Sequence, residues 1–138
     1  MAVSDWFTGL GVLLRRAAWA PIAVVIAHAI IERTTLRVVL DFWIHFSGGA
    51  AIAYFLFVAI ETLQQSVGRV TVAAQTLFAF ALACTVGLFW EFGELASDVF
   101  LGTHIQKDLR NTMSDLIADA SGAVLALGVV AVVRRIRA

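Results

Sequence analysis

Apolar residues fill four long stretches of the chain, and short polar segments separate them. The stretches run over about 17–32, 38–60, 70–95 and 112–133. A bilayer core is about 30 Å thick, so a helix needs roughly 20 apolar residues to cross it. The first stretch is too short to cross the bilayer alone, so we expect the span to include residues beyond one of its ends. Because only helices or closed barrels satisfy their backbone hydrogen bonds in lipid, we predict an all-α membrane protein, an antiparallel bundle of four transmembrane helices in one domain over 1–138.

A shorter amphipathic segment precedes the first stretch. Apolar residues recur at helical spacing between Trp6 and Leu14, and Arg15 and Arg16 follow them. This pattern is typical of a short N-terminal helix that lies at the membrane interface. Two arginines before an apolar run, with an A-x-A-like triplet at 27–29, also resemble a secretory signal. We expect the segment to be kept as a membrane span instead of being cleaved.

Composition agrees with a membrane location. Hydrophobic residues make up 61% of the 138 residues and charged residues only 14%, with a mean hydropathy of +0.90. Soluble domains are about 45–50% apolar and about 25% charged. The lipid bilayer is therefore the expected partner, and the zero net charge gives no basic field for nucleic acid. The single Cys84 excludes an intrachain disulfide, and the oligomeric state stays open.

Lysine and arginine in short loops set the orientation of such a bundle. With four spans both termini lie on one side of the membrane. That side carries Arg15, Arg16, Arg69, Arg134, Arg135 and Arg137, and the other side carries Arg33, Arg37, Lys107 and Arg110. The bias predicts that both termini lie in the cytoplasm.

Ionisable side chains gather at the other end of the predicted bundle. Chain order puts the end of the first span, the start of the second, the end of the third and the start of the fourth at one membrane face. All three histidines and every acidic residue except Asp5 and Glu61 fall there. Helical spacing arranges them in stripes on single helix faces. The stripes are His28/Glu32, Asp41/His45, Glu91/Glu94/Asp98 and Asp108/Thr112/Asp115/Asp119.

So many carboxylates at one depth need neutralisation. A lone ionised carboxylate at the centre of a span costs about 2.5–3.5 kcal/mol. Carboxylates together also repel, so some must be protonated, paired or bound to a cation. A divalent metal ion, whether Zn, Mn, Fe, Mg or Ca, would use this mixture of oxygen and imidazole donors directly. The predicted metal ligands are Asp41, His45, Glu91, Glu94, Asp115 and Asp119.

Further residues near this set are additional candidates, each with an alternative role. They are His28, Glu32, Asp98, Asp108 and Thr112. His28 could equally be a buried hydrogen-bonding residue, and Asp98 and Asp108 could be loop acids. Asp108 is also a candidate helix N-cap, with Asn111 and Ser114 as rivals. His104 fits a loop residue better than a ligand.

Three motifs resemble a known family. They are "DFWIHFSGG" at 41–49, "WEFGELASDVFLGT" at 90–103 and "DLRNTMSDLIADASGA" at 108–123. Together they resemble the YjdF-like inner-membrane proteins of unknown function and, more distantly, the VanZ-like proteins linked to glycopeptide resistance. The resemblance points to Asp41, His45, Gly49, Glu91, Glu94, Gly102, Thr103, Asp108, Thr112 and Asp115. Asn111 stands where the family pattern has Asp, which would remove one charged ligand.

Three functions compete on this evidence, and whether the protein is an enzyme stays open. The first is a metal-dependent hydrolase acting on a lipid-linked or phosphorylated substrate, with Glu94 or Asp119 as the catalytic base. The second is a cation or proton carrier, for which Gln75, Thr76 and Thr85 form only a thin polar path. The third is an accessory structural subunit of a membrane complex. No Ser/His/Asp order, Gly-rich phosphate loop or H-E-x-x-H motif favours one reaction.

Overall fold

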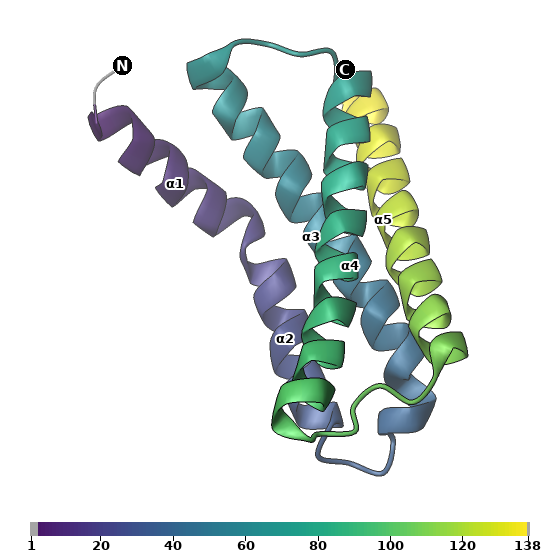
Figure 1. Cartoon of the computed structure of the whole chain (residues 1–138). Helices are drawn as coiled ribbons and strands as arrows, with labels where there is room; N and C mark the ends of the chain where they lie inside the picture. The colour runs from purple at the N-terminus through teal and green to yellow at the C-terminus, as the bar shows by residue number, and fades with distance from the viewer. Residues whose placement is uncertain (1–2, 138) are drawn as a thin grey trace.

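The computed structural model describes residues 3–137, with the side chains of 3–8 and 65–67 outside the description. Every regular element in the described range is an α-helix. The helices are α1 (Val3–Ala17), α2 (Trp19–Ile31), α3 (Arg37–Val67), α4 (Val72–Leu101) and α5 (Leu109–Arg137). The chain runs in one direction through α1 and α2 and then reverses at each loop (Figure 1). Both termini therefore lie at the same end of the bundle.

Three helices are long and apolar enough to cross a membrane by themselves. They are α3, α4 and α5. A fourth crossing exists only if Gly9–Ala17 and Trp19–Ile31 count as one span, and the chain bends by 48° between them. The expected count of four spans is therefore not confirmed. The expected short N-terminal helix is present as α1, whereas the predicted interfacial side chain of Trp6 lies outside the described residues.

The long helices run beyond their apolar stretches. The helix α3 continues to Val67 and α4 to Leu101, beyond the predicted span ends at 60 and 95, so the loops that follow them are shorter than predicted. At 1.5 Å per residue, α3 is about 46 Å long against a hydrocarbon core of about 30 Å. Glu and Gln favour helix, so the polar ends continue outside the hydrocarbon. Gly102, with φ of +65°, ends α4 in the left-handed conformation.

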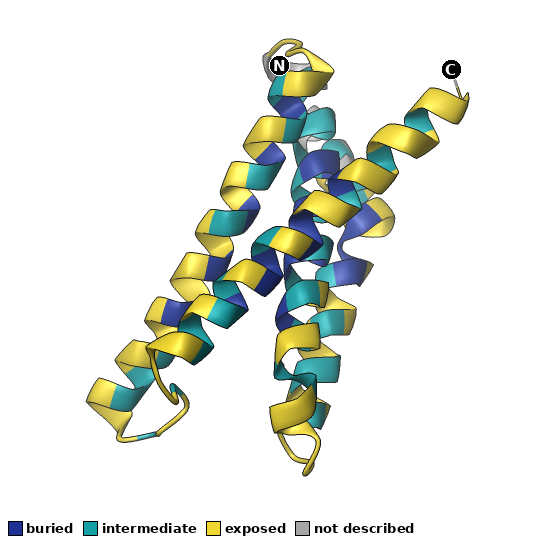
Figure 2. Ribbon diagram, turned by 90° about the vertical axis from the view of Figure 1, so that its right-hand side faces the viewer, coloured by how far each residue is buried: buried dark blue, intermediate teal, exposed yellow. Residues whose placement is uncertain are grey.

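The helix α3 is the centre of the bundle and contacts all four other helices. The apolar core lies in the half nearer the termini and is formed by Ala53, Phe57, Ala79, Ala83, Ala123 and Leu127. Buried residues form a band along the inward helix faces, and exposed residues cover the outward faces (Figure 2). A Cβ atom at Gly122 would overlap the Phe46 carbonyl, so glycine lets α3 and α5 approach closely.

Candidate functional site

Five ionisable side chains meet at the end of the bundle opposite the termini. We call them the His45 cluster: Asp41 and His45 from α3, Glu91 and Glu94 from α4, and Asp115 from α5. They form two groups that share His45, one with Asp41 and Asp115 and one with Glu91 and Glu94. Within each group one donor atom per residue lies within 4.8 Å of the others. Three helices thus direct imidazole and carboxylate donors to one point.

Glu91 is the most unusual member of the His45 cluster. It is 2% exposed, and neither carboxylate oxygen accepts a hydrogen bond from any described residue. The side-chain amide of Gln106 donates to the Glu91 backbone carbonyl at 3.3 Å and leaves the carboxylate untouched. A buried ionised carboxylate without a partner costs several kcal/mol. The Glu91 side chain therefore requires a proton or a cation.

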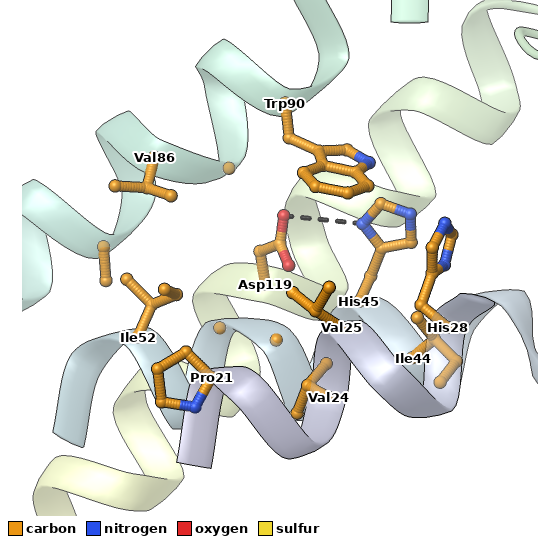
Figure 3. A pocket seen from close by; sticks show the side chains of 14 residues that line it. Pro21, Val24, Val25, His28, Ile44, His45, Ile52, Val86, Trp90 and Asp119 are labelled. Carbon is orange, nitrogen blue, oxygen red and sulfur yellow. Dashed lines mark ion pairs between the residues drawn. The ribbon is translucent and has the colours of Figure 1, made fainter. Parts of the chain in front are cut away.

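His45 lies between two carboxylates of α5. Its Nε2 is 4.0 Å from Asp115 Oδ2, and its Nδ1 is 3.6 Å from Asp119 Oδ2. Asp115 and Asp119 are one helical turn apart, which places them on the same face of α5. Figure 3 shows Asp119 directed at the imidazole ring. Asp119 belongs to neither donor group and approaches His45 from the opposite ring edge.

Glycines make room for Asp119. A Cβ atom at Gly49 would overlap the Asp119 backbone carbonyl, and one at Gly87 would overlap its carboxylate. A Cβ atom at Gly48 would meet Asp119 Oδ1 at an ordinary 3.7 Å. Glycines from two helices therefore accommodate a side chain of α5 next to His45.

The other carboxylates of the His45 cluster each have a neutral or cationic partner. Lys107 Nζ is 2.6 Å from Asp41 Oδ2. The Trp90 indole N–H donates to Glu94 at 2.9 Å, and the Asn111 side-chain amide donates to Asp115. Asn111, which sequence reasoning counted as a lost ligand, thus supports a candidate ligand one turn along α5.

Two of the additional candidates organise the loop between α4 and α5. One Asp98 carboxylate oxygen accepts from the Thr103 hydroxyl at 2.5 Å and from the Ile105 N–H at 2.7 Å, and the other accepts from the Gln106 N–H at 2.9 Å. Asp108 accepts from the Asn111 N–H at 2.8 Å, so the predicted N-cap of α5 is confirmed. Neither carboxylate is part of a donor group.

The remaining additional candidates lie at the edges of the cluster. Thr112 shares a pocket with Glu91, and Glu32 shares another with Asp41, Glu94 and Asp115. His28 packs edge-on against Trp90, with ring centroids 5.4 Å apart. The structure therefore brings these residues close to the His45 cluster without placing them in a donor group.

A separate polar network lies at the end of the bundle near the termini. Glu61 accepts from Arg16 at 3.0 Å and from Arg134, and the buried Gln75 donates to the Phe57 carbonyl at 2.9 Å. The apolar core lies between this network and the His45 cluster. The two polar ends are therefore separated by apolar side chains.

Sequence reasoning missed three contributors to the site. Trp90 contacts both His28 and Glu94. Gly87 lies one turn before Glu91 on the same face of α4, and this spacing could have revealed it. Gln106 is in a loop, where no periodicity indicates which way its side chain points.

The fold and the His45 cluster define an α-helical membrane protein that has buried histidine and carboxylate side chains within its membrane-spanning helices. The model of the family described as Predicted membrane protein (DUF2238) matches residues 11–136, and the chain belongs to this family. The match agrees with the resemblance to membrane proteins of unknown function. Neither the curated proteins nor the solved structures gave a match. The distant resemblance to VanZ-like proteins has no support from these comparisons.

Proposed function

We propose that the His45 cluster binds a divalent metal ion. The observation that supports this proposal is the buried Glu91 carboxylate, which has no hydrogen-bond partner among the described residues and lies in donor range of His45 and Glu94. A divalent ion would neutralise this carboxylate and use the imidazole at the same time. Because His45 contributes a nitrogen, Zn, Mn and Fe fit the donor set better than Mg or Ca, which prefer oxygen ligands only.

The proposed ligands leave room for chemistry. Each donor group supplies three protein ligands, and catalytic zinc sites typically have three protein ligands and one open position for water. An ion held by these ligands would lower the pKa of a bound water molecule and would polarise an ester or phosphoryl oxygen. We therefore propose a hydrolase that adds water across an ester bond of a lipid-linked or phosphorylated substrate. Glu94 is the preferred base for an ion held by Asp41, His45 and Asp115, because Trp90 then occupies only one of its oxygens and the other is free.

Asp119 receives a different role from the one first expected. It faces Nδ1 of His45, while Nε2 faces Asp115. Histidine ligands commonly donate their second ring N–H to a carboxylate, which fixes the ring orientation. We therefore propose Asp119 as a positioning residue that leaves Nε2 available to the metal.

The apolar core argues against a through-membrane carrier. Ala53, Phe57 and Ala79 lie between the two polar ends of the bundle. Thr76 and Thr85 donate to carbonyls of their own helix, so their hydroxyls do not extend a relay. We propose, as the loop charges favour, that the protein lies in the inner membrane with the termini in the cytoplasm and the His45 cluster toward the outer face.

Elemental analysis of the purified protein tests the metal proposal. The parent and the variant Glu61→Gln, which changes an acid at the opposite end, should contain the same stoichiometric metal. His45→Ala and Glu91→Gln should lose it, while circular dichroism shows that their helices remain. A folded parent without metal, after reconstitution with Zn, Mn and Fe in turn, would overturn the proposal and favour the structural-subunit function.

A further inference from the structure

An apolar pocket of about 200 Å³ adjoins the His45 cluster. It lies between α2, α3 and α4, and its polar side chains are His28, His45 and Asp119. Figure 3 shows these three grouped together, with Pro21 and Ile52 on the other side of the pocket. The pocket thus combines an apolar interior with a polar wall that includes the central residue of the proposed metal site.

The pocket lies where two helices fail to pack against each other. The helix α2 packs on α3, but no described residue of α2 lies in backbone packing range of α4. The pocket takes residues from both helices, among them Val25 of α2 and Val86 of α4, so it occupies the gap between them. At this depth a bilayer surrounds the protein with hydrocarbon, and the gap therefore faces lipid chains.

One aromatic contact bridges the same gap beside the cluster. His28 of α2 meets Trp90 of α4 edge-on at 5.4 Å, and Trp90 also donates to Glu94. This pair separates the pocket from the loop end of the bundle, and it connects the gap to a proposed metal ligand. A ligand that enters between α2 and α4 thus arrives from the bilayer.

We propose that this pocket binds the hydrocarbon chain of a membrane-resident amphiphile whose oxygen-bearing head group lies at the His45 cluster. The role of the head group rests on the proposed metal site, because the ion supplies its ligand. The volume equals that of roughly seven water molecules, which suits a segment of one hydrocarbon chain. Lipid is as apolar as the pocket wall, so binding strength must come from the head group and from fit.

The pocket can be filled without touching the cluster. Val86→Trp on α4 and Val25→Trp on α2 each add an indole at a residue that lines the pocket and is at least partly exposed. Leu82→Trp is the matched control, because Leu82 lies one turn earlier on α4, is 45% exposed and does not line this pocket. All three variants retain every residue of the His45 cluster.

The probe is a long-chain fatty acid with a photoreactive diazirine, added to protein in phosphatidylcholine vesicles with and without a chelator. Peptide mapping by mass spectrometry should find label at Val24 and Ile52 in the parent and in Leu82→Trp. In Val86→Trp and in Val25→Trp the labelling of the pocket should fall to the background level found on the outward, lipid-facing sides of the helices. Labelling spread evenly over all lipid-facing helices, or pocket labelling unchanged in both filled variants, would overturn the inference.

The same samples separate this inference from the metal proposal. If the protein contains no metal but its pocket is labelled, and Val86→Trp removes the label, chain binding is supported and the metal proposal fails. Stoichiometric metal without pocket labelling overturns chain binding while the metal proposal stands. Labelling that is present with metal and falls after chelation supports both.

Discussion

The imidazole of His45 and the carboxylate of Asp119 face each other across the α3–α5 interface, with Nδ1 3.6 Å from Oδ2. The contact requires close backbones, and Gly49 provides this because a Cβ atom there would overlap the Asp119 carbonyl. With Nδ1 facing Asp119, the other ring nitrogen, Nε2, lies 4.0 Å from Asp115 Oδ2. Gly49 thus brings α3 close enough to α5 for Asp119 to face the imidazole of His45.

Asp119→Asn should weaken metal binding without removing a ligand. Loss of a carboxylate behind a ligating histidine typically lowers metal affinity by about 10–100-fold. Titration against a competing chelator measures the affinity, and Glu61→Gln serves as the control at the other end of the bundle. An affinity equal to that of the parent would show that Asp119 does not position His45.

Glu91→Leu should have opposite effects on stability with and without metal. In a chelator, replacing a buried carboxyl group that has no hydrogen-bond partner by an apolar residue of similar size should stabilise the protein by about 1–3 kcal/mol. With metal at about 1,000 times its dissociation constant, the parent gains about 4.1 kcal/mol that the variant lacks, which exceeds the stabilisation of the variant. The unfolding midpoints of the parent and of Glu91→Leu, measured in detergent with chelator and with metal, test this prediction. The prediction is contradicted if the same protein has the higher midpoint under both conditions.

Gly122→Ala should destabilise the α3–α5 contact. The added methyl group would overlap the Phe46 carbonyl, and overpacking of this kind costs about 1–3 kcal/mol. Gly128→Ala on the same helix is the matched control, because a Cβ atom there meets nothing within 4 Å. It should be neutral or stabilising by up to about 1 kcal/mol through helix propensity. Equal unfolding midpoints for the two variants would rule out the close approach.

Asp98→Ala should loosen the loop and leave the metal in place. The variant removes the acceptor for the Thr103 hydroxyl and for backbone N–H groups including that of Ile105. Hydrogen exchange should therefore rise over 102–108, while metal content equals that of the parent. A loss of metal without faster exchange would instead make Asp98 a ligand.

The orientation of the bundle can be read from single cysteines in a Cys84→Ser background. Ile105→Cys lies in the loop at the cluster end and Val70→Cys in the loop at the terminal end, and both positions are exposed. Membrane-impermeant maleimide on intact cells should label Ile105→Cys only, and Val70→Cys should react after lysis. The reverse pattern would place the His45 cluster on the cytoplasmic side.

Local periodicity predicted a large part of this architecture. The helical class, the apolar centres of α3, α4 and α5 and the short helix before α2 all follow from hydropathy and spacing. Helix ends were less well predicted, because a polar residue such as Glu61 can either continue a helix beyond the bilayer or begin a loop. The bend between α1 and α2 has a mark in the sequence that was overlooked, because the single Pro21 has no N–H to donate to the Ala17 carbonyl.

Chain order alone determined that the acids and histidines lie at one end, because alternating helix directions return those segments to the same face. Only the tertiary structure decided what each acid contacts. In the structure, Asp41 forms an ion pair with Lys107, and Asp98 accepts hydrogen bonds from the loop that follows α4. The carboxylate of Glu91 is buried without a hydrogen-bond partner among the described residues. The physical reason is that helical spacing fixes which face a residue occupies, whereas the rotation and separation of neighbouring helices, set here by glycines such as Gly49, determine what that face meets.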